Sequence, residues 1–171
     1  MAKKILTIGR DPGLRFEVAL GRPAGGDTSL AWGDLRLFLD DEAIWESESD
    51  AADARSKPVN WTWIELLEYL GKQWPWLCLE EDYPIPGVTP LYPSELRKEA
   101  EKRWLDLPQE VSDAEEMAVF RYLLRHDLSS ALSGCYLPSL LIKPQGKQCI
   151  LSSATLGKSF IRPKDEVIET L

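Results

Sequence analysis

The sequence predicts an α+β fold in which an antiparallel sheet packs against three or more helices. Apolar and polar side chains alternate at residues 14–20 and 35–39, which is typical of half-buried strands. Helical spacing dominates the middle of the chain, where Thr62 and Ser112 each open a capping-box sequence. A chain of 171 residues can bury one sizeable core, so we expect a single domain over residues 1–171.

Strands are expected near both ends of the chain. The first group comprises residues 5–8, 14–20, 35–39 and 43–45, with a turn at Asp40-Asp41-Glu42. The polar stretch 46–58 is expected to form a mobile surface loop. Residues 139–153 predict a hairpin, and its consecutive apolar residues favour burial on both faces. We therefore expect this hairpin to join the first sheet.

Three helices are expected to start near Thr62, Ser94 and Ser112. The first should end at Pro75, and its inward face is predicted to carry Trp63, Leu66, Leu67, Leu70 and Trp74. The third is predicted to bury Met117, Phe120 and Leu124. A last, short helix should follow Pro163; either it packs on the body of the protein, or the chain is cut from something longer.

Charge and cysteine content limit the classes of function. The net charge of −8 disfavours nucleic acid as a partner, because phosphates attract Lys and Arg. The first apolar run ends at Gly9, which is too short for a signal peptide or a membrane span. Cys78, Cys135 and Cys149 are widely spaced and include no Cys-x-x-Cys pair, so we expect reduced thiols in a cytoplasmic protein.

The sequence lacks the motifs and residue spacings that are typical of catalytic and metal sites. His126 is the single histidine, and neither zinc-ligand spacing nor a Gly-x-Ser-x-Gly elbow accompanies it. We therefore expect no catalytic residue, no metal and no cofactor. Two alternatives stay open: an enzyme that uses the adjacent carboxylates Glu80, Glu81 and Asp82, and an acidic inhibitor that mimics nucleic acid.

An interaction surface is the leading hypothesis. Seven tryptophans are many for this length, and Trp anchors many interfaces. Trp61 and Trp76 fall outside the predicted helix stripe, although burial of both in the core is the competing interpretation. Arg121, Arg125 and His126 form a small basic group. The candidate binding residues for a protein partner are Trp61, Trp76, Tyr83, Arg121, Arg125 and His126.

Three stretches of the chain also resemble a known family. They are Ile44-Trp45 with residues 61–70, then residues 125–132, and then residues 137–142 leading to Leu151-Ser152-Ser153. Together they resemble, over about residues 44–171, the region that precedes the peptidase in bacterial proteins of the ImmA/IrrE-type zinc metallopeptidase group. The His-Glu-x-x-His motif of those peptidases is absent, so no catalytic residue carries over. The resemblance implies an accessory or regulatory module.

Overall fold

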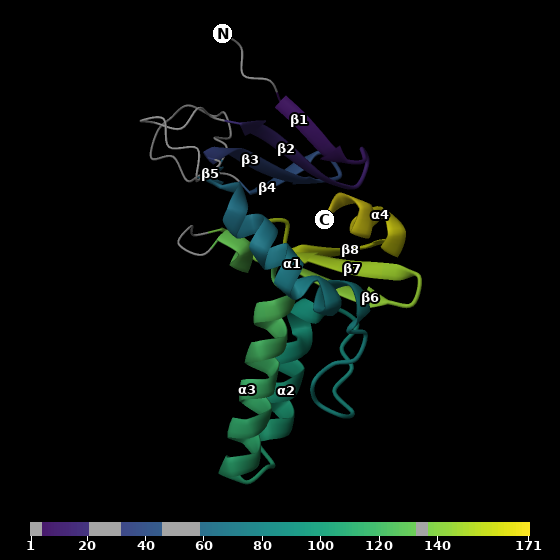
Figure 1. The fold of residues 1–171 in the computed structure, drawn as a ribbon. Helices are drawn as coiled ribbons and strands as arrows, with labels where there is room; N and C mark the ends of the chain where they lie inside the picture. Colours follow the sequence, from purple (N-terminus) through teal and green to yellow (C-terminus); the bar gives the residue numbers. More distant parts are fainter. Residues whose placement is uncertain (1–4, 21–31, 46–58, 133–136) are drawn as a thin grey trace, which may run out of the picture. The chain divides into compact units, whose positions relative to one another are not determined.

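The structure is a computed structural model that describes residues 5–20, 32–45, 59–132 and 137–171. It contains helices and two antiparallel sheets, which confirms the predicted α+β class (Figure 1). The chain falls into two compact units. Unit 1 comprises Met1–Lys72, Ala131–Pro138 and Asp165–Leu171, and unit 2 comprises Gln73–Ser130 and Ser139–Lys164. The expectation of a single domain stays a prediction, and the loop predicted at 46–58 lies outside the described residues.

Unit 1 is built on a five-stranded antiparallel sheet. Its strands are β1 (Ile5–Gly9), β2 (Leu14–Leu20), β3 (Trp32–Leu39), β4 (Glu42–Trp45) and β5 (Val59–Thr62). The order is β1-β2-β3-β4, and β5 pairs with the first half of β3 while β4 pairs with its end. The strands predicted before residue 46 are therefore confirmed, whereas β5 was not expected.

Alternation decides which side chains of this sheet are buried. Leu35, Leu37 and Leu39 are all buried, and the residues between them are half-buried. Asp40 and Asp41 form the two-residue turn to β4 with φ values of 52° and 66°. Short polar side chains tolerate this left-handed conformation, which matches the twist of a tight hairpin.

Helix α4 (Lys164–Thr170) packs on the β1–β2 end of the same unit. The Thr170 hydroxyl donates to the Leu14 carbonyl oxygen at 3.3 Å. Arg10 lies 3.1 Å from Glu169 and 3.7 Å from Glu166. A short helix is marginal in isolation, so these contacts hold it in place.

Unit 2 contains a separate three-stranded sheet. Strands β6 (Leu140–Gln145), β7 (Gln148–Ser153) and β8 (Lys158–Pro163) follow one another in antiparallel order. The predicted hairpin is confirmed as β6 and β7, but the expectation that it joins the first sheet is wrong. It pairs instead with β8, whose polar, half-exposed sequence gave no strand signal.

Helix α1 (Trp63–Leu79) begins where it was expected, but it does not end at Pro75. Leu77 and Cys78 are buried one turn later, and their burial offsets the hydrogen bond that Pro75 cannot donate. The predicted inward face is correct for Leu66 and Leu70, which are buried. It is wrong for Leu67 and Trp74, which are exposed.

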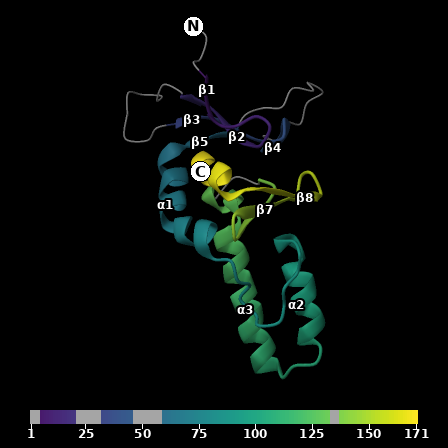
Figure 2. The same ribbon diagram turned by 90° about the vertical axis from the view of Figure 1, so that its right-hand side faces the viewer.

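A helical hairpin projects from the sheet of unit 2 (Figure 2). A single 3₁₀ turn, η2 (Pro93–Glu95), leads into α2 (Leu96–Trp104), and α3 (Gln109–His126) returns beside it. Helix α3 begins at Gln109, before the predicted capping box, because the Ser112 backbone N–H already donates to the Pro108 carbonyl oxygen at 3.0 Å. After α3, a second 3₁₀ turn, η3 (Leu128–Leu132), leads out of the unit.

The buried face of α3 differs from the predicted one. Val119, Tyr122 and His126 are buried, and the first two join a core with Ile85, Val88, Leu96 and Ala100. Met117, Phe120 and Leu124 are 50%, 57% and 51% exposed, so their predicted burial is wrong. Both faces of α3 carry apolar residues at helical spacing, and periodicity alone cannot choose between them. No helix of the described residues is both long and apolar enough to cross a membrane.

Candidate functional site

A charged network surrounds Glu80 at the end of α1. The Glu80 carboxylate accepts hydrogen bonds from two nitrogens of the Arg125 guanidinium: Nη2 donates to Oε1, and Nε donates to Oε2 at 2.6 Å. The same Oε2 lies 2.8 Å from His126 Nε2. Burial by itself raises the pKa of Glu80, but the hydrogen bonds from Arg125 and His126 outweigh it and lower the pKa below its usual value. Glu80 is therefore an ionised acceptor.

His126 links this network to the sheet of unit 2. The ring is 0% exposed, and Nδ1 lies 2.6 Å from the Ile142 carbonyl oxygen in β6. Burial lowers the pKa of His126, whereas its hydrogen bonds to Ile142 and Glu80 act in the opposite direction. Both ring nitrogens face oxygen acceptors, and only the protonated ring can donate to both of them at once. Burial opposes that form, because it outweighs the hydrogen bonds and lowers the pKa of His126 below its usual value.

Aromatic rings line one side of the network. Tyr122 stacks on the His126 ring with 4.1 Å between centroids, and Tyr83 lies 5.5 Å from Tyr122. Lys143, which is buried in β6, places its ammonium 4.8 Å from the centre of the Tyr83 ring. The Tyr122 hydroxyl is buried and has no hydrogen-bond partner among the described residues. Burial raises the pKa of both tyrosines, so each stays neutral.

Four of the predicted binding residues lie in or beside this network. Arg125 and His126 bind Glu80, Tyr83 joins the aromatic group, and the Arg125 guanidinium lies 4.9 Å above the half-exposed ring of Trp76. Arg121 does not join them: it is exposed on α3. Trp61 belongs to β5 in unit 1, and the structure does not describe its side chain.

The three adjacent acids do not converge on one site. Glu80 is taken up by Arg125 and His126, while Glu81 lies 3.6 Å from Lys164 near the surface. Asp82 is exposed. A general acid would need a raised pKa, and that of Glu80 is lowered instead. The network therefore fits a paired, stabilising cluster.

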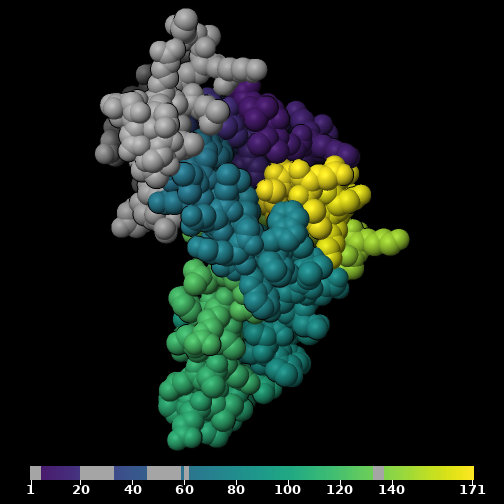
Figure 3. All heavy atoms as spheres, in the orientation of Figure 1, coloured from purple at the N-terminus to yellow at the C-terminus, as the bar shows by residue number. Residues whose placement is uncertain are grey.

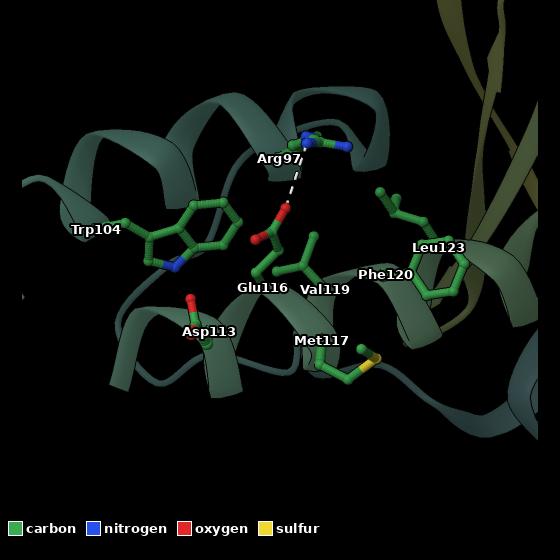
Figure 4. A pocket seen from close by; sticks show the side chains of 8 residues that line it. All are labelled: Arg97, Trp104, Asp113, Glu116, Met117, Val119, Phe120 and Leu123. Carbon is green, nitrogen blue, oxygen red and sulfur yellow. Dashed lines mark hydrogen bonds and ion pairs between the residues drawn. The ribbon is translucent and has the colours of Figure 1, made fainter. Parts of the chain in front are cut away.

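A hollow lies between α2 and α3 on the helical hairpin. It has a volume of about 470 Å³ and is lined by Arg97, Trp104, Asp113, Glu116, Met117, Val119, Phe120 and Leu123. Figure 4 shows side chains of the two helices facing each other across it, with Arg97 paired to Glu116. Glu115 also holds the helices together, because it accepts hydrogen bonds from Arg103 and from the Trp104 indole at 3.1 Å.

Beside the hollow, α3 presents an outer stripe of three exposed apolar residues, Met117, Phe120 and Leu124. Their spacing places them on one face of the helix, and two of them also line the hollow. The spheres of α2 and α3 lie side by side along this hairpin (Figure 3). Apolar side chains that gather on one face and border a hollow are typical of binding surfaces.

Neither a metal site nor a comparison with known proteins assigns a function to the described residues. No group of three or more His, Cys, Asp or Glu side chains in the described part of the chain could hold a metal ion. Comparison of the chain with family models, curated proteins and solved structures gives no match. The resemblance to the metallopeptidase-associated region therefore stays an expectation.

Several features of the network around Glu80 were not predicted from the sequence. Tyr122 shares a helix face with Val119 and His126, and that spacing could have revealed it. The pairing of Glu80 with Arg125 joins residues 45 positions apart, and no local pattern announces it. Lys143 gave no signal, because nothing in a strand sequence shows that a lysine is buried.

Proposed function

We propose that this chain is a non-catalytic protein-interaction module in the cytoplasm, and that its partner binds the outer stripe of α3 and the adjacent hollow. The observation that carries the proposal is the exposure of Met117, Phe120 and Leu124 on one face of a helix, beside a hollow lined by apolar groups. An amphipathic helix is the element that fits such a surface, because its apolar stripe fills a groove between two helices.

The charged side chains in the hollow favour a specific partner over any apolar one. Arg97, Asp113 and Glu116 line the hollow together with Trp104, Val119 and Leu123. Apolar residues at the centre supply most of the binding energy, whereas charges at the rim select the partner. The buried thiols of Cys78 and Cys149 form no disulfide within the described part of the chain, which supports a reducing compartment.

The network around Glu80 supports this function indirectly. It ties the end of α3 to β6 through His126 and to the end of α1 through Arg125. A rigid base lets the hairpin present a preformed surface, which lowers the entropic cost of binding. The resemblance to the region that precedes the metallopeptidase implies an accessory or regulatory role for such a surface.

Affinity capture with matched variants tests the proposal. The wild-type chain, Phe120→Asp and Leu91→Asp would each be used as bait in cytoplasmic extract, with circular dichroism confirming that all three fold. Leu91 is 61% exposed and Phe120 is 57% exposed, so the control makes an equal change at a similar surface position outside the stripe. We expect a partner that the wild type and Leu91→Asp retain and that Phe120→Asp loses. Equal capture by all three baits would contradict the proposed surface.

A further inference from the structure

Helix α3 has a strong polarity of charge along its length. Its first half carries Glu110, Asp113, Glu115 and Glu116, and its second half carries Arg121, Arg125 and His126. Most of these charges are already paired within unit 2, because Glu115 binds Arg103, Glu116 binds Arg97, and Arg125 and His126 bind Glu80. Asp113 accepts a hydrogen bond from Gln109 at 2.6 Å, which leaves Glu110 and Arg121 without a partner within the described residues.

Glu110 and Arg121 lie on the same side of the helix. They are 11 positions apart, which is about three turns and about 16 Å along the axis. Ala114 follows Glu110 by four positions and Met117 precedes Arg121 by four, so the four residues are symmetric about one level of the helix. All four side chains are exposed.

This symmetry is the pattern that an isologous helix pair requires. In a two-fold, antiparallel pair the same patch occurs on both copies. Each residue then faces the residue that lies equally far on the other side of the axis, and the two must be complementary. Glu110 then meets Arg121 of the other copy twice, and the large Met117 meets the small Ala114 twice. A groove specialised for an unrelated helix would need no such internal symmetry.

We propose that the partner of this surface is a second copy of the chain, with α3 packed antiparallel to α3 about a two-fold axis between Ala114 and Met117. This inference rests on the proposed function, since it names the occupant of the same surface. Phe120 then lies opposite the exposed Val111 of the other copy, and Leu124 lies opposite Leu107, just before the other copy's α3 begins. Because α2 lies beside each α3, the pair gives an arrangement of four helices. Ridge-into-groove packing of such helices places their axes about 8–10 Å apart.

Charge reversal followed by complementation tests the register. Arg121→Glu alone puts two acids opposite each other at both ends of the interface, and Glu110→Arg alone puts two arginines there. Sedimentation velocity over a concentration series should show a dimer for the wild type and a dissociation constant at least about tenfold higher for each single variant. An equimolar mixture of the two variants restores opposite charges at both ends, and should return the affinity to within about threefold of the wild type. Lys147→Glu, at an exposed turn, is the control for net charge and should behave as the wild type.

Three results would overturn the inference: a wild-type chain that is monomeric up to its solubility limit, a dimer that neither reversal weakens, or a mixture that fails to recover. The proposed function fails separately. If the chain is monomeric but Phe120→Asp still loses a captured partner of different sequence, the surface binds another protein and only the second-copy inference is wrong. If Phe120→Asp changes neither capture nor self-association, both are wrong.

Discussion

Replacing Glu80 with Gln removes the charge at the centre of the network while keeping the shape of the side chain. The amide retains one oxygen acceptor, but it cannot accept from both sides of Arg125 and from His126 at once. The half-buried Arg125 and the buried His126 then lack a full set of partners. We expect Glu80→Gln to destabilise unit 2.

The structure sets the size of this effect. Removing one partner of a buried ion pair costs about 3–5 kcal/mol. The side chains of Glu80 and Arg125 are 19% and 22% exposed, so water replaces part of the loss. The remaining amide oxygen replaces another part, which leaves an expected loss of about 3 kcal/mol in the free energy of unfolding. For a chain of this size that corresponds to a fall in Tm of about 6–12 °C.

Urea unfolding at neutral pH, followed by circular dichroism, measures the loss. Glu81→Gln is the matched control, because Glu81 is adjacent to Glu80 and makes an exposed ion pair with Lys164 at 3.6 Å. Removing the charge of Glu81 should lower the free energy of unfolding by less than about 0.5 kcal/mol. Since the folded pKa of Glu80 lies below its usual value, its contribution is complete above that value and is lost as the pH falls through the folded pKa. The stabilities of the wild type and Glu80→Gln should therefore converge in acid. Equal losses for Glu80→Gln and Glu81→Gln would refute the role of the network.

Three further predictions concern buried groups. Tyr122→Phe removes a buried hydroxyl that has no partner among the described residues, so the free energy of unfolding should change by less than about 1 kcal/mol or rise, and a loss above about 2 kcal/mol in urea unfolding would contradict this. Gly33→Ala should cost about 1–3 kcal/mol by thermal unfolding, because a Cβ there collides with Trp63 Nε1 and lies 2.8 Å from the Ala19 carbonyl oxygen; unchanged stability would show that Trp63 moves aside. Burial raises the pKa of Cys149 to about 12 and also raises that of Cys78. In a Cys135→Ser variant, neither remaining thiol should therefore react with a thiol reagent at neutral pH until urea unfolds the chain. Rapid labelling of the native variant would contradict their burial.

The local patterns of the sequence predicted most of the elements. Alternation located β2 and the end of β3, and the paired aspartates located the turn between β3 and β4, because strand periodicity and left-handed turn residues are local properties. Helical spacing located α1, α2 and α3. Strand β5 was missed because it has only four residues and pairs with β3, which is distant in sequence. Strand β8 was missed because its sequence is polar and half-exposed.

The candidate site was only partly predictable for the same reason. Tyr83, Arg125 and His126 stood out by residue type, but nothing in the sequence paired them with Glu80 and Tyr122. The buried face of α3 was predicted on the wrong side, because Met117, Phe120 and Leu124 have the same helical spacing as Val119, Tyr122 and His126.

The sequence by itself determined the α+β class and most of the element positions, because these depend on periodicity, turn residues and composition. Only the tertiary structure decided that the late hairpin pairs with β8 in its own sheet, and which of the two apolar faces of α3 is buried. Both choices depend on contacts between residues far apart in the chain. Burial goes to the face whose neighbours fit, and the other face is left exposed on α3 as the surface proposed here to bind a partner.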